Sequence, residues 1–362
     1  MNQELLNKYA DEWKQIGEYQ SSFGPAAKEP LRNFPISERE NFEKLFRGEK
    51  PVYMPSITDM LAFSPAIVPD HRVRAWALEI ADPVLPGGQC DGGPDMFGVE
   101  WVYIPITGGS MVRGDNPKIK DISHWEDYIT FPDLDSWDWE GSAAGNAALF
   151  NDRRMNRIWL MNGLNERMLS LMNFADVMQS YVDEDMQEGV HRFFDKLCTF
   201  YDDLFERYRK YYHCDVIMFN DDWGTQRGPQ FSPDTAREML MPYVRRLVES
   251  CHKRGMYFEI HSCGKNDIIA PVFAECGIDI WLPQENINDF ALLYELIGDK
   301  VKLGIPTDST PGMSDEEAWV EAERFMERYG NKANVIANTT FPPQHPRMAE
   351  FLYCLSREEY AK

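Results

Sequence analysis

The chain has 362 residues, and its 37 basic and 59 acidic side chains give a formal net charge of −22. Hydrophobic residues at 43% and charged residues at 27% are ordinary for a folded globular protein, which excludes disordered, collagen-like and coiled-coil classes. The acidic excess argues against nucleic acid and anionic membranes as main partners, because both attract clustered positive charge. No apolar run reaches the roughly 18 residues that a membrane-spanning helix needs.

The cysteines and the first residues bear on the cellular compartment. Seven cysteines, an odd number scattered through a long acidic sequence, are typical of a reducing environment rather than a disulfide framework. Residues 1–20 have neither a basic start nor an apolar core, so we expect no secretion signal. These features together predict a cytoplasmic protein.

The N-terminal third is the least regular part of the sequence. Residues 1–25 are predicted to be helical, and residues 36–49 fit a second helix, capped by Ser37 with Glu40 placed for a capping box. A first strand is expected over residues 51–57. We therefore expect a helical extension over residues 1–50 and one catalytic domain over residues 51–362.

Residues 80–140 are rich in Gly, Pro, Asp and Trp. Within them, the glycine-rich segment 86–98 is interpreted as a long functional loop, and residues 98–106 as a strand or hairpin arm. The aromatic side chains of this region, Trp101 among them, would line an aromatic pocket or pack on a surface loop.

From about residue 158, strand and helix patterns alternate regularly. The predicted strands are IWLMNG (158–163), DVIMFNDDWG (215–224), MYFEIHSCG (256–264), IDIWLPQEN (278–286), VKLGIPTDS (301–309) and ANVIANTTF (333–341). The helices between them include 183–212 and 232–255, the latter with Ser232 as N-cap and Pro233 at its first position. Continuous apolar strands covered by helices predict a parallel sheet.

The ends of these strands carry polar residues, and this decides between an open sheet and a closed barrel. The strand-end residues are Asp221 and Asp222, His261 and Cys263, Glu285, Asp308, and Asn338. In a (β/α)8 TIM barrel the carboxyl ends of the strands converge on one mouth, where the active site is built. No glycine-rich nucleotide-binding motif follows any strand, so the sequence favours the α/β barrel.

The strongest local signal is the pair His261 and Cys263. Residues two apart in a strand face the same side, so the imidazole and the sulfur would point together into the mouth. Both are preferred zinc ligands, and Glu285, at the end of the next strand, would complete a His/Cys/Glu metal set. The alternative is that His261 and Cys263 are core residues without a metal.

Three aspartates are candidates for catalysis. Asp221 and Asp222 would supply a general acid, a metal ligand or a cofactor contact, with Asp222 favoured, although adjacent aspartates at a strand end also cap helices. Asp308 lies in a similar position and would act as a general acid if its pKa were raised; otherwise it caps a turn with Ser309 and Thr310.

The sequence from about residue 158 to 345 resembles the uroporphyrinogen decarboxylase superfamily, and within it the cobamide-dependent methyltransferases. The likeness is carried by FNDDWG, by SPDTAREMLMPYVRRLVESCHKRGMYFEIHSCG, by IDIWLPQE and by LGIPTD, in that order. The resemblance implies a (β/α)8 barrel with a zinc ion held by an H-x-C pair, here His261 and Cys263. An H-x-C pair followed by a glutamate resembles the zinc site of cobalamin-independent methionine synthase, which supports Glu285.

One feature of the methyltransferase pattern is missing. The resemblance implies a later cysteine near the last strand, where this sequence has Asn338 to Thr340 instead, and Cys354 lies further along in the last helix. The site would then hold three protein ligands, or be completed by Asp308, Asp222 or substrate. The arginine-rich signature with which the decarboxylases bind porphyrinogen carboxylates is not recognisable.

The resemblance implies an enzyme that moves a methyl group from a methoxylated, often aromatic, substrate to cob(I)alamin. Because no D-x-H-x-x-G motif is present, the cobalamin is expected on a separate corrinoid protein, with Gly163, Glu166, Arg167 and Asn338 as candidate cofactor contacts. Three alternatives stay open: a methylcobamide:thiol methyltransferase, a metal-free decarboxylase, and a non-catalytic corrinoid-binding subunit. A homodimer also stays open.

Overall fold

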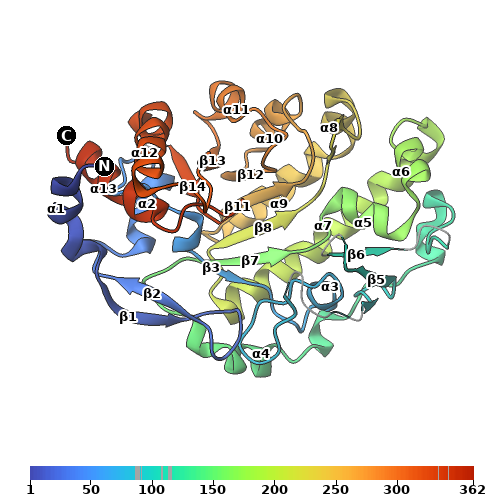
Figure 1. The fold of residues 1–362 in the computed structure, drawn as a ribbon. Helices are drawn as coiled ribbons and strands as arrows, with labels where there is room; N and C mark the ends of the chain where they lie inside the picture. Colours follow the sequence, from blue (N-terminus) through green and yellow to red (C-terminus); the bar gives the residue numbers. More distant parts are fainter. Residues whose placement is uncertain (86–89, 91, 107–108, 113–115, 333, 341) are drawn as a thin grey trace.

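A curled parallel sheet forms the centre of the molecule (Figure 1). The computed structural model describes residues 1–362 apart from 86–89, 91, 107–108, 113–115, 333 and 341. Within the described residues the sheet has seven strands in the order β14-β13-β12-β11-β8-β7-β3. They are β3 (Leu61–Phe63), β7 (Asn156–Leu160), β8 (Val216–Asn220), β11 (Tyr257–Ser262), β12 (Ile280–Pro283), β13 (Lys302–Pro306) and β14 (Val335–Asn338).

The sheet curls into a barrel, as the sequence predicts. Its two edges meet through the segment before β3, where Ser56 forms a parallel bridge with Ala337 and the N–H of Ala337 donates to the carbonyl of Pro55 at 2.8 Å. The predicted strand over residues 51–57 is wrong, because this segment forms only the bridge. Pro55 has no N–H to donate, and Ser56 caps the 3₁₀ turn Ile57–Asp59 that follows.

Helices fill the connections between the strands and cover the outside of the sheet (Figure 1). They are α5 (Leu164–Leu171), α6 (Phe174–Ser180), α7 (Glu184–Tyr212), α8 (Pro233–Met239), α9 (Met241–Lys253), α10 (Ala270–Cys276), α11 (Phe290–Ile297), α12 (Asp315–Tyr329) and α13 (Met348–Tyr360). The single helix expected over 232–255 is divided at Leu240, because Pro242 cannot donate the hydrogen bond that would continue it. None of the described helices is both long and apolar enough to cross a bilayer.

The N-terminal segment is only partly helical. After α1 (Gln3–Trp13), residues predicted to continue the helix form instead the antiparallel hairpin of β1 (Gln15–Gln20) and β2 (Lys28–Arg32). The turn between these strands contains Gly24 at φ +113°, followed by a proline, and neither favours a helix. The predicted capping box of Ser37 and Glu40 is confirmed at the start of α2 (Glu38–Phe46).

A second, antiparallel sheet lies in the connection after β3. It contains β4 (Gly93–Pro94), β5 (Glu100–Ile104) and β6 (Gly109–Val112), so the strand predicted over 98–106 is confirmed as β5. Short elements α3 (Pro69–Val73) and α4 (Trp139–Gly145) flank it, and β9 (Gly224–Thr225) and β10 (Gly228–Pro229) form a small ribbon after β8. Residues 86–89 and 91 of the predicted functional loop lie outside the described residues.

The inner face of the barrel changes from apolar to polar towards the carboxyl ends of the strands. At the other end, Phe42 and Leu45 of α2 pack on Val216, Ile280 and Ile336 and close the barrel. The next layer holds a buried ion pair, in which the Nε of Arg157 on β7 lies 2.5 Å from an oxygen of Glu259 on β11. Because residues two apart in a strand share a face, His261 lies on the same face as Glu259 and one step nearer the mouth.

Candidate metal site at the barrel mouth

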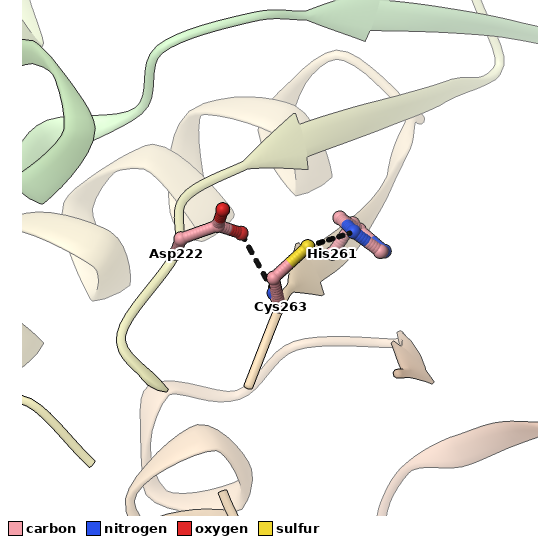
Figure 2. A group of neighbouring side chains, drawn as sticks. All are labelled: Asp222, His261 and Cys263. Carbon is pink, nitrogen blue, oxygen red and sulfur yellow. Dashed lines mark hydrogen bonds between the residues drawn. The ribbon is translucent and has the colours of Figure 1, made fainter. Parts of the chain in front are cut away.

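Asp222, His261 and Cys263 come together just beyond β8 and at the end of β11 (Figure 2). One ligand atom of each lies within 4.8 Å of the others, and all three residues are half-buried. The Nε2 of His261 lies 3.4 Å from the Sγ of Cys263, and Oδ1 of Asp222 accepts a hydrogen bond from the backbone N–H of Cys263 at 2.6 Å. The alternation along β11 thus places imidazole and thiol side by side, as the sequence pattern predicts.

Two glycines allow the loops that carry these residues to touch. Gly264 has φ +92°, and a Cβ there would overlap the backbone of Gly224; a Cβ on Gly224 would lie 2.7 Å from the carbonyl oxygen of Cys263. The N–H of Trp223 also donates to the Oγ of Ser262 at 2.9 Å. The glycines that close the DDWG and HSCG segments therefore fix the distance between Asp222 and the other two donors.

Burial determines which protonation states His261 and Cys263 adopt when no metal is bound. It lowers the pKa of His261, against the opposing charges of Glu259, Glu166 and Glu285, so the imidazole stays neutral and keeps a lone pair. Burial raises the pKa of the Cys263 thiol, and the carboxylates of Asp222 and Glu166 add to this effect. Cys263 is thus a thiol in the metal-free site and would release a proton on binding a metal ion.

The donor set fits zinc. Imidazole nitrogen, thiolate sulfur and carboxylate oxygen are all zinc ligands, and three protein ligands that leave one position open are the usual pattern of a catalytic site. The three ligand atoms lie within 4.8 Å of one another, a spacing that a single metal ion would span.

Glu285, the third ligand predicted from sequence, is not one of the three grouped residues. It lies in the turn after β12, and its Oε1 accepts a hydrogen bond from the Nδ2 of Asn338 at 3.2 Å. Its charge still acts on His261, since it opposes the lowering of the imidazole pKa. Glu285 as a ligand stays a prediction, while Asp222, which the sequence leaves open as a completing ligand, lies in the group.

Asp221 is enclosed rather than presented to the mouth. It is fully buried, and its two oxygens accept hydrogen bonds from the N–H of Glu166 and from the Nε1 of Trp223, both at 2.8 Å. Burial raises its pKa to about 7. Gly163 lies directly against it, since a Cβ there would approach the Cβ of Asp221 to 2.5 Å. These contacts give Asp221 and Gly163 a positioning role between β8 and α5.

Glu166 and Arg167 are neighbours in α5 but have different surroundings. The carboxylate of Glu166 accepts hydrogen bonds from the Nδ2 of Asn220 and from the Nη1 of Arg74, the latter at 2.9 Å, and it raises the pKa of Cys263 by its charge. Arg167 is fully buried and forms ion pairs with Asp70 and Asp95. Of these two predicted cofactor contacts, only Glu166 lies beside the metal candidates.

Asp308 lines a cavity that is separate from the group of Asp222, His261 and Cys263. It is exposed and lines, with Glu285, a cavity of about 430 Å³ between the ends of β12 and β13 and the helices α11 and α12. Its backbone N–H donates to Glu321 at 3.1 Å. Asp308 is therefore not brought together with Asp222, His261 and Cys263.

Sequence reasoning missed Arg74, which follows α3 and contacts Glu166. It lies in an irregular segment far from the strand-end residues in sequence, and no motif surrounds it. It also missed the buried pair of Arg157 and Glu259. The charged residues in two otherwise apolar strands were the available signal for that pair.

Comparison with known proteins agrees with this architecture. Residues 168–341 match the model of the family described as Uroporphyrinogen decarboxylase (URO-D). Among solved structures, a methyltransferase from Methanosarcina mazei superimposes with a TM-score of 0.60 at 15% identity, covering 90% of this chain and 100% of that chain. At this identity the likeness shows a shared fold.

A second solved structure is more distant. A D-psicose 3-epimerase with D-tagatose from Clostridium cellulolyticum gives a TM-score of 0.33 at 12% identity, and the alignment covers 61% of this chain and 81% of that chain. No curated protein sequence matches the chain.

Proposed function

We propose that the protein is a zinc-dependent methyltransferase that moves the methyl group of a methoxylated, aromatic substrate to the cob(I)alamin of a separate corrinoid protein. The observation that carries the proposal is the convergence of Asp222, His261 and Cys263 at the barrel mouth. Two further findings support it: the URO-D family domain, and the fold shared with a protein described as a methyltransferase.

In the proposed reaction the bond between methyl carbon and ether oxygen breaks, and a bond between methyl carbon and cobalt forms. The leaving oxygen keeps the electron pair of the broken bond, so it must be stabilised as negative charge or receive a proton. Zinc held by His261, Cys263 and a third ligand, either Asp222 or Glu285, would keep one position open and supply Lewis acidity at that oxygen.

The chain's own residues prepare the position of the substrate oxygen. Asp222 and Cys263 are fixed to each other by the 2.6 Å hydrogen bond, so the two donors are preorganised. Burial raises the pKa of Asp222, so as a general acid, the alternative to its role as a metal ligand, it would donate a proton to the leaving oxygen. Glu166 and Asn338 are proposed as contacts for the corrinoid.

The proposal is tested first by metal content. Zinc-loaded wild-type protein is expected to retain about one equivalent of zinc by elemental analysis, and His261→Ala and Cys263→Ala are expected to lose it. Cys276→Ala, a buried cysteine of α10 away from the site, is the matched control and is expected to keep zinc. Glu285→Gln tests whether Glu285 is a zinc ligand. A variant that keeps its full zinc content would show that Glu285 does not bind the metal.

Activity is tested by single turnover. Zinc-loaded protein is mixed with cob(I)alamin and a panel of methoxylated phenols and benzoates, and the conversion to methylcobalamin is followed by absorbance. We expect conversion that disappears in Cys263→Ala. Stoichiometric zinc with no conversion across the panel, on free cobalamin or on corrinoid protein, would refute the demethylation.

A decarboxylase of the same family is the second candidate, because the matching family model carries that name. The two candidates differ in their need for a metal. Wild-type protein that carries no zinc after loading, and that releases carbon dioxide from an acid substrate, would support the decarboxylase. Transfer from methylcobalamin to a thiol would support the reverse methyltransferase.

A further inference from the structure

Arg74 lies beside Glu166, near the proposed metal ligands at the barrel mouth. Its Nη1 donates to the Oδ1 of Asn162 at 2.5 Å and to the Oε1 of Glu166 at 2.9 Å, and its guanidinium carbon lies 5.1 Å from the ring centre of Trp101. Asn162 follows β7 and Glu166 begins α5, so the side chain is fixed by three elements. A guanidinium fixed in this way loses little further entropy when it binds a ligand.

One edge of the guanidinium is left open. The Nε and Nη2 atoms have no hydrogen-bond partner among the described residues. They are not among the fully buried unpaired atoms either, so they are open to solvent. The side chain keeps 17% of its surface exposed. Two N–H groups that point the same way therefore remain available to a ligand.

Arg74 is connected to the segment of Asp222 through Glu166. Burial by itself would lower the pKa of Arg74, but the carboxylates of Glu166 and Asp222 outweigh it and keep the group charged. The charge of Arg74 in turn opposes the raised pKa of Cys263. Glu166, the partner of Arg74, accepts a hydrogen bond from Asn220 at the end of β8 and donates its backbone N–H to Asp221, the neighbour of Asp222, so the guanidinium lies on the Asp222 side of the site.

We propose that Arg74 binds a carboxylate of the methyl donor through Nε and Nη2, so that the substrate is a methoxylated aromatic acid. This rests on the proposed function and narrows its substrate class. The planar edge of a guanidinium matches the two oxygens of a carboxylate. A doubly charged phosphate would fit less well, because the carboxylates of Asp222 and Glu166 repel it.

Aromatic side chains near Arg74 suit the ring of such an acid. Trp76 and Trp159 are both half-buried, and their rings lie with centres 4.7 Å apart and planes tilted by 32°. Trp159 lies on β7 on the same face as Arg157, and its Nε1 is buried without a partner among the described residues. The indole faces would bury the ring while the carboxylate reaches Arg74.

The test compares a charged and a neutral ligand of the same shape. Binding of 3-methoxybenzoate and of 3-methoxybenzamide to zinc-loaded protein is measured by calorimetry, for wild type, Arg74→Gln and Arg72→Gln. We expect Arg74→Gln to weaken benzoate binding roughly 10- to 100-fold and to leave benzamide binding nearly unchanged. Arg72 is exposed and forms its ion pair, within the part of the chain that the structure describes, with Asp82, so its variant should bind both ligands as wild type does.

Each outcome separates this inference from the proposed function. Equal losses for both ligands in Arg74→Gln, or wild-type protein that does not prefer the benzoate, would overturn the role of Arg74. Methyl transfer from neutral donors alone would also overturn it, while leaving the methyltransferase intact. Selective benzoate binding without methyl transfer would support Arg74 and refute the methyltransferase.

Discussion

Gly163 lies at the start of α5, pressed against the end of β8. A methyl group at this position would lie 2.5 Å from the Cβ of Asp221 and 2.6 Å from the ring of Phe219. We expect Gly163→Ala to lower the free energy of unfolding by about 1–3 kcal/mol, because neither neighbour has room to move. Urea denaturation followed by circular dichroism measures the change.

Gly145 provides the control for this substitution. It ends α4, and no atom lies within 4 Å of the position that its Cβ would take. Gly145→Ala should be neutral or stabilising by about 0.5–1 kcal/mol, since alanine favours a helix. Equal stability of the Gly163→Ala variant and the wild type would contradict the close packing of Gly163 on Asp221.

At the scale of single residues, sequence could predict the part of the site that depends on strand alternation. His261 and Cys263 face together because they are two apart in β11. The third donor could not be chosen, because Asp222 and Glu285 both follow strands and only the paths of their loops distinguish them. Arg74 was missed for a similar reason: an irregular segment brings it to the mouth.

The buried pair of Arg157 and Glu259 connects β7 to β11 across β8. Glu259 is fully buried, so Glu259→Gln leaves the charge of Arg157 without a partner in a dry environment. We expect a loss of about 3–5 kcal/mol in unfolding free energy. The double variant with methionine at both positions should recover most of it, and a double variant as unstable as Glu259→Gln would show that the pair itself is needed.

The capping box of α2 stabilises the helix that closes the bottom of the barrel. The hydroxyl of Ser37 accepts a hydrogen bond from the N–H of Glu40, and the carboxylate of Glu40 accepts one from the backbone N–H of Ser37. Ser37→Ala should cost about 1 kcal/mol, as measured by chemical denaturation. Ser314 heads an equivalent box on α12, so Ser314→Ala should give a matching loss. A loss at neither position would contradict the capping role.

At the scale of elements, patterns with a clear period and clear end signals predicted well. The long helix α7 and the strands β8 and β11 agree with sequence because their buried faces are continuous. The helix predicted over residues 1–25 includes β1 of the hairpin, because this exposed strand carries no strict alternation. Tertiary contacts, rather than local propensity, decide such short segments.

Two buried carboxyls make the stability of the whole molecule depend on pH. Burial raises the pKa of both Asp59 and Asp221 to about 7, whereas the unfolded chain releases these protons near pH 4. Between these values the folded protein holds more protons, so a rise in pH favours unfolding. We expect stability to fall from pH 5 to pH 8 by up to about 1.4 kcal/mol per pH unit for each group.

The measurement is the urea midpoint as a function of pH. Asp59→Asn should flatten the slope, because the neutral amide cannot ionise and can still accept the hydrogen bond from Ser56. Glu317→Gln removes an exposed carboxylate whose pKa is lowered, so it should leave the slope between pH 5 and 8 as it is. A flat profile for the wild type would contradict the raised pKa values.

At the scale of the whole molecule, the barrel could be predicted because polar residues end successive strands and helices separate them. The closure of the ring could not, since it depends on a non-repeating segment. The combination of a helix and a β-hairpin in the N-terminal segment could not be predicted either. The division of the chain into an extension and a catalytic domain at residue 50 stays a prediction.

The join between Pro55 and Ala337 has a consequence for how the barrel moves. A single β-bridge and a hydrogen bond between the hydroxyls of Ser56 and Thr339 close the ring there among the described residues, while a longer ladder joins β8 to β11 on the opposite side. Thermal breathing should therefore start at this seam. We expect β8, which leads to Asp222, and β11, which carries His261, to stay in register when this join opens. The entrance of the barrel would then widen without a change in the positions of the proposed metal ligands.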